Sequence, residues 1–397
     1  MMTNNPTADG VSVELGEDFA ELRESVRRIC AQYPAPYWRD LDERRAYPTE
    51  FVDELTKGGF LAALIPEEYG GAGLPLRAAA VILEEINACG CTASPAHAQM
   101  YIMGTLLRHG SEAQKRAYLP SIASGELRLQ AFGVTEPDTG SDTTKLKTRA
   151  VRRGDVYVVN GQKVWTSRAL HSDMMLLLAR TTPLDQVKRK TEGLSVFLID
   201  MRDAIGRGMR IEPIKAMINH NTTEVFFDDL EIPADSLIGE EGKGFGYILD
   251  GMNAERILVA TEALGDGRWL MNKATEYAGN REVFGRPIGA NQGIQFPLAR
   301  CHAELQAADM MCRRAAALFQ AGADCGADAN IAKLLASEAT WNAAEAAMQT
   351  FGGFAFAQEY DIERKWREAR IYQTAPISTN MVLAYIGTKV LGLPRSY

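Results

Sequence analysis

The spacing of apolar residues divides the chain into a helical part, a strand-rich part and a second helical part. From Asp18 to about Glu126, apolar residues recur every three or four positions, which predicts amphipathic helices. From about Leu129 the pattern becomes that of strands, with further strands expected at 174–179, 194–200 and 224–227. After Gly239 the helical spacing returns and continues nearly to the C-terminus. The pattern predicts helices, then a sheet, then helices.

One turn signal lies inside the strand-rich part. The apolar run 156–159 is followed by Asn160-Gly161 and then by Val164-Trp165. Asn-Gly supplies the positive φ angles of a type I′ turn, so the segment predicts a β-hairpin that turns at Asn160-Gly161.

Length and composition narrow the class of protein. With 397 residues, 46% of them hydrophobic, the chain suits two or three packed units. A net charge of -8 gives no basic footprint for nucleic acid. No apolar run is long enough to span a membrane, and residues 1–10 are polar without a signal-peptide pattern, so we expect a cytoplasmic protein.

The six cysteines predict neither a disulfide scaffold nor a metal site. Cys89 and Cys91 lack the second close pair that a zinc site needs. Cys301 and Cys312 follow the helical spacing of their apolar neighbours, which is typical of small core residues.

Glycines and hydroxyls gather where the helical and strand-rich parts meet. The segment 132–142 could hold a polar ring edge or a phosphate, or be only a turn. Trp165, with hydroxyls at Thr166 and Ser167, could contact a flat ligand or belong to the core. No G-x-G-x-x-G follows a strand, so a classical Rossmann dehydrogenase is not predicted.

Five motifs, in the same order, resemble those of the acyl-CoA dehydrogenase family. Besides 132–142 and 163–167, they are P-E-x-Y-G-G at 66–71, R-x-x-F-G-x-P-I at 281–288 with the glutamines of 291–296, and Q-x-x-G-G at 349–353. The resemblance covers the chain from about Asp18 onward. It implies an α+β fold with an N-terminal α-helical domain at 18–128 after a flexible tail at 1–17, a β-barrel-like middle domain at 129–240 and a C-terminal four-helix bundle at 241–397.

The resemblance also implies a cofactor and partners. They are FAD, an acyl-CoA substrate, an electron-transferring flavoprotein as electron acceptor, and assembly as a homotetramer or homodimer. By position, it assigns FAD contacts to Phe132, Val134, Thr135, Ser141, Trp165, Ser167, Arg281, Phe284, Gln292, Gln349, Gly352, Gly353, Ser378 and Asn380. Those from Arg281 to Gly353 would hold the adenosine diphosphate half across a subunit interface. It assigns substrate contacts to Ser141, Met100, Met252 and Arg256.

The catalytic base departs from the pattern of most family members. They carry a Glu near the C-terminus where this chain has Pro376, which has no proton-accepting side chain. Other subfamilies, of the isovaleryl-CoA and long-chain type, carry the base in an earlier Glu-Arg pair, here Glu255-Arg256. Glu255 interrupts an apolar helical stripe formed by Ile248, Met252 and Val259, so we expect it to be partly desolvated.

Two further expectations concern this helix. Gly251, one turn before Glu255, would leave open space for substrate. Glu255 could instead form an ion pair with a neighbouring helix, whereas direct pairing with Arg256 is disfavoured because adjacent helical side chains point in different directions.

The sequence leaves the substrate and the reaction open. By resemblance, the helix at 94–107 lines the acyl cavity, where methionines such as Met100 and Met103 suit an apolar chain and His97 and Gln99 a polar group. The same residues could also be ordinary core. The position of the base favours short branched acyl groups. The alternatives are a same-fold acyl-CoA desulfinase, oxidase or monooxygenase, or a flavin-free paralogue that only binds CoA or a protein.

Overall fold

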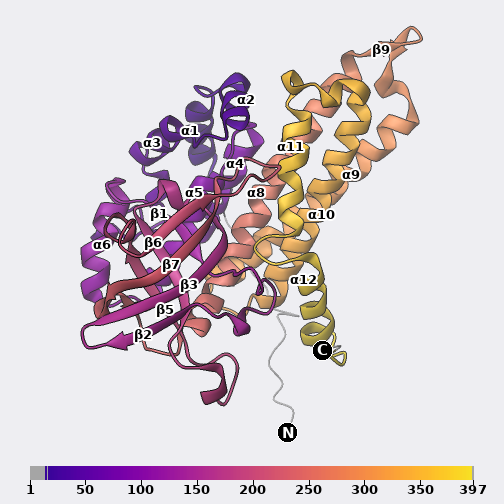
Figure 1. Cartoon of the computed structure of the whole chain (residues 1–397). Coiled ribbons are helices and arrows are strands. Elements are labelled where there is room, and N and C mark those ends of the chain that lie inside the picture. The colour runs from indigo at the N-terminus through magenta and orange to yellow at the C-terminus, as the bar shows by residue number, and fades with distance from the viewer. Residues whose placement is uncertain (1–13, 16, 396–397) are drawn as a thin grey trace. The chain divides into compact units, whose positions relative to one another are not determined.

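The structure is a computed structural model that describes residues 14–15 and 17–395 (Figure 1). Most of the tail expected at 1–17 lies outside the described residues. The chain forms two compact units. One unit contains the described residues up to Asp40, then Pro75–Ala93 and the chain from Asn253 onward; the other contains Leu41–Leu74 and Ser94–Met252. The expected order of helical, strand-rich and helical segments is confirmed.

The unit that contains the sheet combines α-helices with an eight-stranded sheet. The helices are α3 (Thr49–Lys57), α5 (Ser94–His109) and α6 (Glu112–Ser124), and a short α7 (Met201–Ala204) follows β5. The strands are β1 (Leu129–Gly133), β2 (Arg149–Arg153), β3 (Val156–Ser167), β4 (Met174–Arg180), β5 (Leu194–Asp200), β6 (Met209–Pro213), β7 (Thr222–Pro233) and β8 (Leu237–Ile238). They lie in the order β6-β7-β3-β2-β4-β5-β8, and β1 pairs in parallel with β4.

Strand β4 is buried on both faces, and it joins the two hydrophobic cores of this unit. Met174 and Leu176 pack in one core with side chains of α5 and α6, whereas Met175 and Leu177 pack in the other with side chains of β3 and β5. Because successive side chains of a strand point to opposite faces, one continuous apolar run serves both cores.

The hairpin expected at Asn160-Gly161 is wrong. Strand β3 continues through both residues and pairs with β7, with a bulge between Val159 and Gly161. A Cβ at Gly161 would lie 2.6 Å from the Thr148 Cα atom, so glycine is needed for a close backbone approach. The turn lies earlier, between β2 and β3, at Gly154 with φ of 64°.

The other unit consists mainly of helices. They are α1 (Ala20–Cys30), α2 (Ala35–Arg44), α4 (Leu76–Ala88), α8 (Gly244–Asn280), α9 (Gln292–Gln320), α10 (Gly326–Phe351), α11 (Ile362–Ala369) and α12 (Thr379–Tyr385), with α2 and α8 each crossing the boundary between units. The short strands β9 (Glu282–Val283) and β10 (Arg286–Pro287) pair between α8 and α9. Cys301 and Cys312 are buried on α9, as expected for core residues.

Buried charged and polar side chains connect α4, α8 and α11 through hydrogen bonds. The Lys365 Nζ atom lies 2.7 Å from the Asp266 carboxylate and donates to the carbonyl of Cys91. The Tyr372 hydroxyl donates to the same carboxylate and accepts from the Asn87 amide. Burial raises the pKa of Asp266 to about 6, against the opposing charge of Lys365.

None of the helices that the structure describes is both long and apolar enough to cross a membrane. In the same part of the chain, no group of three or more His, Cys, Asp or Glu side chains is arranged to hold a metal ion.

The loop at 66–71 provides a test of the packing. A Cβ at Gly71 would lie 2.1 Å from the Ile65 carbonyl oxygen, so Gly71→Ala must displace backbone and should cost about 1–3 kcal/mol of stability. Thermal unfolding should show a lowered midpoint. The control is Gly279→Ala on α8, where a Cβ meets nothing within 4 Å and alanine should add up to about 1 kcal/mol. Equal midpoints for the two variants would contradict this packing.

Candidate functional site

The ends of β1 and β3 bring several assigned residues together. The Val164 amide donates to the Thr135 carbonyl at 2.9 Å, which places Thr135 beside the segment that carries Trp165 and Ser167. Trp165 is 60% exposed, so its interpretation as a core residue is wrong. Its φ is 62°, and Arg168 also has a positive φ of 60°. Such backbone conformations are rare for residues other than glycine and cluster at functional sites.

A buried ion pair fixes this loop from inside the unit. The Lys163 Nζ atom donates to the carbonyl of Val134 at 3.0 Å and lies 2.9 Å from a carboxylate oxygen of Glu136. The backbone amides of Lys147 and Thr148 also donate to Glu136. The Lys163 side chain is fully buried and that of Glu136 is 5% exposed. The loop that begins at Val134 is therefore held by one cation and its carboxylate partner.

The pKa values of the pair follow from burial and mutual attraction. Burial lowers the pKa of Lys163 to about 8, although Glu136 opposes the shift. For Glu136, burial acts to raise the pKa, but the charge of Lys163 and the hydrogen bonds from Lys147 and Thr148 outweigh it, so the pKa is lowered. Both groups are charged near neutral pH.

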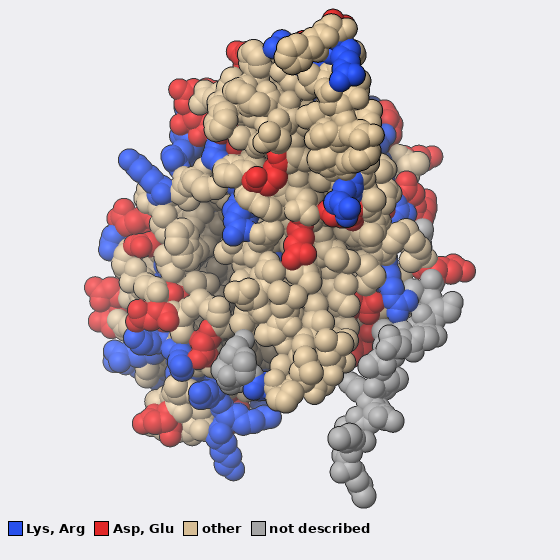
Figure 2. Space-filling view, turned by 90° about the vertical axis from the view of Figure 1, so that its right-hand side faces the viewer, with Lys and Arg blue, Asp and Glu red and all other residues tan. Residues whose placement is uncertain are grey.

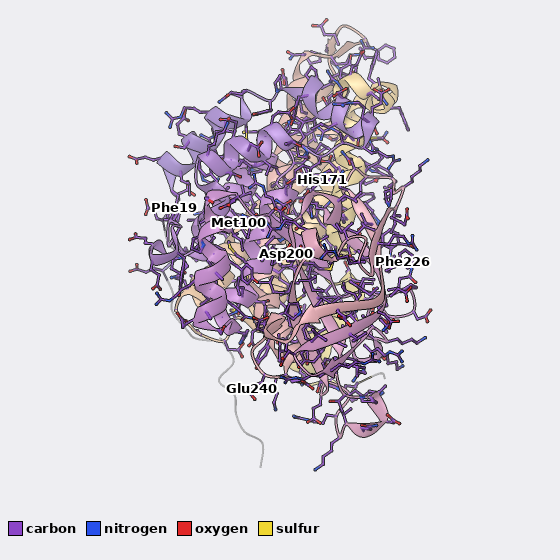
Figure 3. All side chains as sticks on the ribbon, turned by 60° about the vertical axis from the view of Figure 1, so that its left-hand side comes forward. Phe19, Met100, His171, Asp200, Phe226 and Glu240 are labelled. Carbon is purple, nitrogen blue, oxygen red and sulfur yellow. The ribbon has the colours of Figure 1, made fainter. Side chains whose placement is uncertain are left out.

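The remaining assigned residues of this unit lie on α5, β1 and the following loop. Phe132 is half-buried and packs against Tyr101, with ring centroids 5.7 Å apart. Ser141 lies exposed in the loop. Met100, labelled in Figure 3, is buried on α5. Gln99 is also fully buried, and its amide atoms have no hydrogen-bond partner among the described residues.

The expectation of open space at Gly251 is wrong. A Cβ at this position would lie 3.0 Å from the Arg108 Nη2 atom and 4.0 Å from the Thr105 hydroxyl. The missing side chain therefore makes room for the guanidinium of Arg108, which reaches over from α5. Spacing along α8 alone could not identify this neighbour.

Glu255 lies on α8 as the apolar stripe predicts. It is 6% exposed, Ile248 and Val259 are buried, and Met252 is half-buried. The neighbouring Arg256 donates to the side chain of Asn253 at 3.0 Å. Burial lowers the pKa of Arg256, and the charge of Glu255 acts in the opposite direction. The expected desolvation of Glu255 is thus confirmed by its burial.

The segment near Pro376 has a structural role. The Ser378 hydroxyl accepts from the amide of Met381 and caps the N-terminus of α12, while Asn380 is exposed at the start of that helix. The Lys333 ammonium donates to the carbonyl of Ile377 at 2.8 Å. The S-T-N sequence after a proline could have been interpreted as a helix start.

A second group of assigned residues gathers at the ends of α8, α9 and α10. Tyr277 stacks on Phe351 at 4.1 Å between ring centroids, and the Arg281 guanidinium carbon lies 5.9 Å from the centroid of Phe354. Gly352 and Gly353 are exposed, and a Cβ on either would meet nothing within 4 Å. The other members of this group, all exposed, are Phe284, Gln292 and Gln349.

Each unit thus contains its own set of assigned residues. In the sheet unit, exposed Trp165 has a strained backbone and lies near the hydroxyl of Ser167 in sequence. In the helical unit, Arg281, the side-chain amides of Gln292 and Gln349, and the backbone of Gly352-Gly353 are exposed. Sequence reasoning missed the Lys163–Glu136 pair, although a lysine inside an apolar strand was a signal that a buried carboxylate must lie nearby.

Family models match nearly the whole chain. They are the acyl-CoA dehydrogenase N-terminal domain at residues 16–126, the middle domain at 131–230 and the C-terminal domain at 242–390. The chain belongs to the acyl-CoA dehydrogenase family. It is therefore an oxidoreductase with the α+β fold of that family.

Relatives and solved structures agree with this membership. The acyl-CoA dehydrogenase FadE12 of Mycobacterium tuberculosis is 36% identical, over 96% of this chain and 98% of its own length. A cyclohex-1-ene-1-carbonyl-CoA dehydrogenase of Syntrophus aciditrophicus is 34% identical, over 96% of this chain and 91% of its own. A glutaryl-CoA dehydrogenase solved with glutaryl-CoA has a TM-score of 0.89 at 30% identity, over 97% of this chain and 98% of its own.

The buried pair makes a prediction for this acyl-CoA dehydrogenase. Lys163→Met should cost about 3–5 kcal/mol, because it leaves the Glu136 carboxylate buried without its cation. A lowered unfolding midpoint and weaker retention of flavin during gel filtration would measure the effect. The control is Lys147→Met, which removes only an exposed pair with Asp138. An unchanged midpoint in Lys163→Met would show that the pair does not hold the loop.

Proposed function

We propose that the protein catalyses FAD-dependent α,β-dehydrogenation of an acyl-CoA thioester to the trans-2-enoyl-CoA, with Glu255 as the base that removes the α proton. The observation that carries this proposal is the burial of Glu255 on the apolar face of α8, combined with Pro376 at the position where most family members carry the base. Removal of an acidic hydrogen beside a thioester needs a positioned base, and Pro376 has no group that accepts a proton.

The residues present fit a flavin. Trp165 offers an exposed aromatic face, and the Thr135 and Ser167 segments offer hydroxyls and backbone amides close to it. In the helical unit, exposed Arg281 suits a pyrophosphate, and the bare backbone of Gly352 and Gly353 permits close approach of a ligand. When bound, FAD supplies the acceptor for the hydride that leaves the β carbon. The protein residues would hold it, orient the thioester and take the proton.

Burial prepares Glu255 for this role. Glu255 is 6% exposed, which limits the access of water to its carboxylate, as suits a general base that acts on a bound substrate. Arg256 follows directly and carries a desolvated charge of opposite sign. The positive charge of Arg256 would influence how readily the Glu255 carboxylate accepts a proton.

We propose short, branched or cyclic acyl groups as substrates. The family's subfamilies with a Glu-Arg base include branched-chain enzymes, and one relative is a cyclohex-1-ene-1-carbonyl-CoA dehydrogenase. On α5, Met100 and Met103 are buried, and Met103 packs in a hydrophobic core of the sheet unit as an ordinary core residue does.

We propose assembly into a homotetramer or homodimer, with an electron-transferring flavoprotein as electron acceptor. The side of the C-terminal helices seen in Figure 2 carries a broad uncharged area. Large apolar side chains are exposed at Phe284, Phe296 and Phe356, and Phe284 is 100% exposed. Exposed apolar area of this kind is typical of protein–protein contacts. One solved neighbour, at 29% identity, comes from work on the electron-transferring flavoprotein of Acidaminococcus fermentans.

The assignment of the base is testable by substitution. Glu255→Gln should retain FAD but slow flavin reduction by roughly 10² to 10⁴, or about 3–5 kcal/mol in the barrier, as expected for loss of a general base. Anaerobic stopped-flow measurement of flavin absorbance would give the rate. The matched control is Glu276→Gln, which alters an exposed carboxylate of the same helix. A loss below about tenfold in Glu255→Gln would remove Glu255 as the base.

A panel of thioesters tests the reaction and the substrate class together. Isobutyryl-, isovaleryl- and cyclohexanecarbonyl-CoA should bleach the flavin faster than palmitoyl-CoA under anaerobic conditions. Fastest bleaching by palmitoyl-CoA would refute the proposed size limit. Product formation with a flavin that stays yellow would favour a non-redox reaction such as desulfination, and purification without bound FAD would favour a flavin-free paralogue.

A further inference from the structure

Three cysteines lie near one another in the helical unit, at the end of α1 and in the loop after α4. Cys30 is the last residue of α1, Cys89 is the C-cap of α4, and Cys91 follows two residues later. The Cys91 sulfur lies 4.0 Å from the Cys30 carbonyl oxygen, and Arg27 and Glu85, one turn before Cys30 and Cys89, form an ion pair at 2.6 Å, so the ends of α1 and α4 lie side by side. Cys30 and Cys91 are buried, whereas Cys89 is exposed. An accessible thiol, that of Cys89, and a buried one, that of Cys30, therefore lie at neighbouring helix ends.

The loop that carries Cys89 is held firmly. Gly90 has φ of 83°, and a Cβ there would lie 2.5 Å from the indole nitrogen of Trp269. Its carbonyl accepts from Arg364 at 3.2 Å, and the carbonyl of Cys91 accepts from the buried Lys365 at 2.7 Å. The positions of the two loop cysteines beside α1 are thus fixed by buried cations.

The three thiols differ in their surroundings. The hydrogen bond from Cys30 lowers the pKa of Cys89, although burial and the charge of Glu85 act in the opposite direction. Hydrogen bonds with Cys89 and Cys91, together with burial, raise the pKa of Cys30. The Cys91 sulfur lies 4.0 Å from the Cys30 carbonyl and 3.9 Å from that of Tyr33. Cys89, which is exposed and has the lowered pKa, is therefore the thiol that an oxidant reaches first.

Cys89 is also reached from a cavity of about 620 Å³. Its lining includes Cys89, Gly90, Tyr33 and Trp269, all within the helical unit. A small oxidant can therefore approach Cys89 from the cavity, whereas Cys30 is 4% exposed and is not part of the lining.

We propose that Cys89 and Cys30 form a peroxide-responsive dithiol, in which exposed Cys89 is oxidised first and buried Cys30 then closes a disulfide. In the first step the Cys89 thiolate attacks hydrogen peroxide, the O–O bond breaks, and sulfenic acid and hydroxide form. In the second step the Cys30 sulfur attacks the sulfenic sulfur, the S–O bond breaks, and the disulfide and water form as Cys30 loses its proton. Peroxide is reduced by two electrons and the two cysteines are oxidised by two.

This arrangement meets the requirements of a redox-sensitive site. The attacking thiol is accessible and has a lowered pKa, and the resolving thiol lies at the end of the neighbouring helix. Reversible disulfides of this type are the form in which disulfides usually occur inside cells. The two thiols would respond to peroxide whether or not the protein has the proposed dehydrogenase activity.

Thiol counting and peptide mapping on the intact, flavin-loaded protein test the proposal. After treatment of the reduced protein with a small excess of hydrogen peroxide, titratable thiols should fall from six to four, and mass spectrometry should find the Cys30 and Cys89 peptides linked. Dithiothreitol should restore all six. Linkage of Cys89 to Cys91, linkage between two chains, or oxidation of Cys89 to sulfinic acid without linkage would overturn the proposal.

Variants separate the two roles. Cys89→Ser should retain its remaining thiols through the same treatment, and Cys30→Ser should accumulate Cys89 sulfenic acid that dimedone labels. The matched control, Cys301→Ser, changes a cysteine on α9 and should still form the Cys30–Cys89 disulfide. Disulfide formation in Cys89→Ser at the wild-type rate would contradict the assignment. The wild-type peptide map decides the question even if a variant at Cys30 fails to fold.

Discussion

A side chain stays charged inside a protein only where an opposite charge or hydrogen bonds compensate for the loss of water. Each unit of this chain contains such a buried ion pair. In the sheet unit, Lys163 and Glu136 form a pair that fixes the carbonyl of Val134 and, through it, the loop after β1. In the helical unit, Lys365 and Asp266 connect α11 with α8, and the same ammonium binds the loop after α4. The segments proposed to contact FAD and the cysteine cluster are each positioned by one of these pairs.

Glu255 is the residue on which the proposed reaction depends. Its helix face is apolar, and the residues one turn away on either side, Met252 and Val259, bring no charge. Glu255 is also buried, with 6% of its surface exposed, which suits a group that takes a proton from a bound thioester. The proline at 376 strengthens this argument, because the alternative position offers no carboxylate.

The periodicity of the sequence predicted the element order, the strands β4 and β5 and the burial of Glu255, because these depend on local spacing. It failed at Gly161 and Gly251, where the glycine is required by a neighbour distant in sequence, the Thr148 backbone in one case and the Arg108 guanidinium in the other. It also missed the Lys163–Glu136 pair and the proximity of Cys30 to Cys89, since a partner on another element leaves no trace in the spacing. The sequence left Trp165 open between the core and a ligand contact, and its 60% exposure excludes the core.

The account depends most on the proton that Glu255 is proposed to remove, and hydrogen exchange at the α carbon measures that step by itself. A thioester with sulfur in place of the β carbon has no hydride to transfer, so any exchange in deuterium oxide reports deprotonation alone. The account predicts that the FAD-loaded wild-type protein introduces deuterium at the α carbon and that the Glu255→Gln protein, with FAD still bound, does not. Exchange at the same rate in both proteins would contradict it.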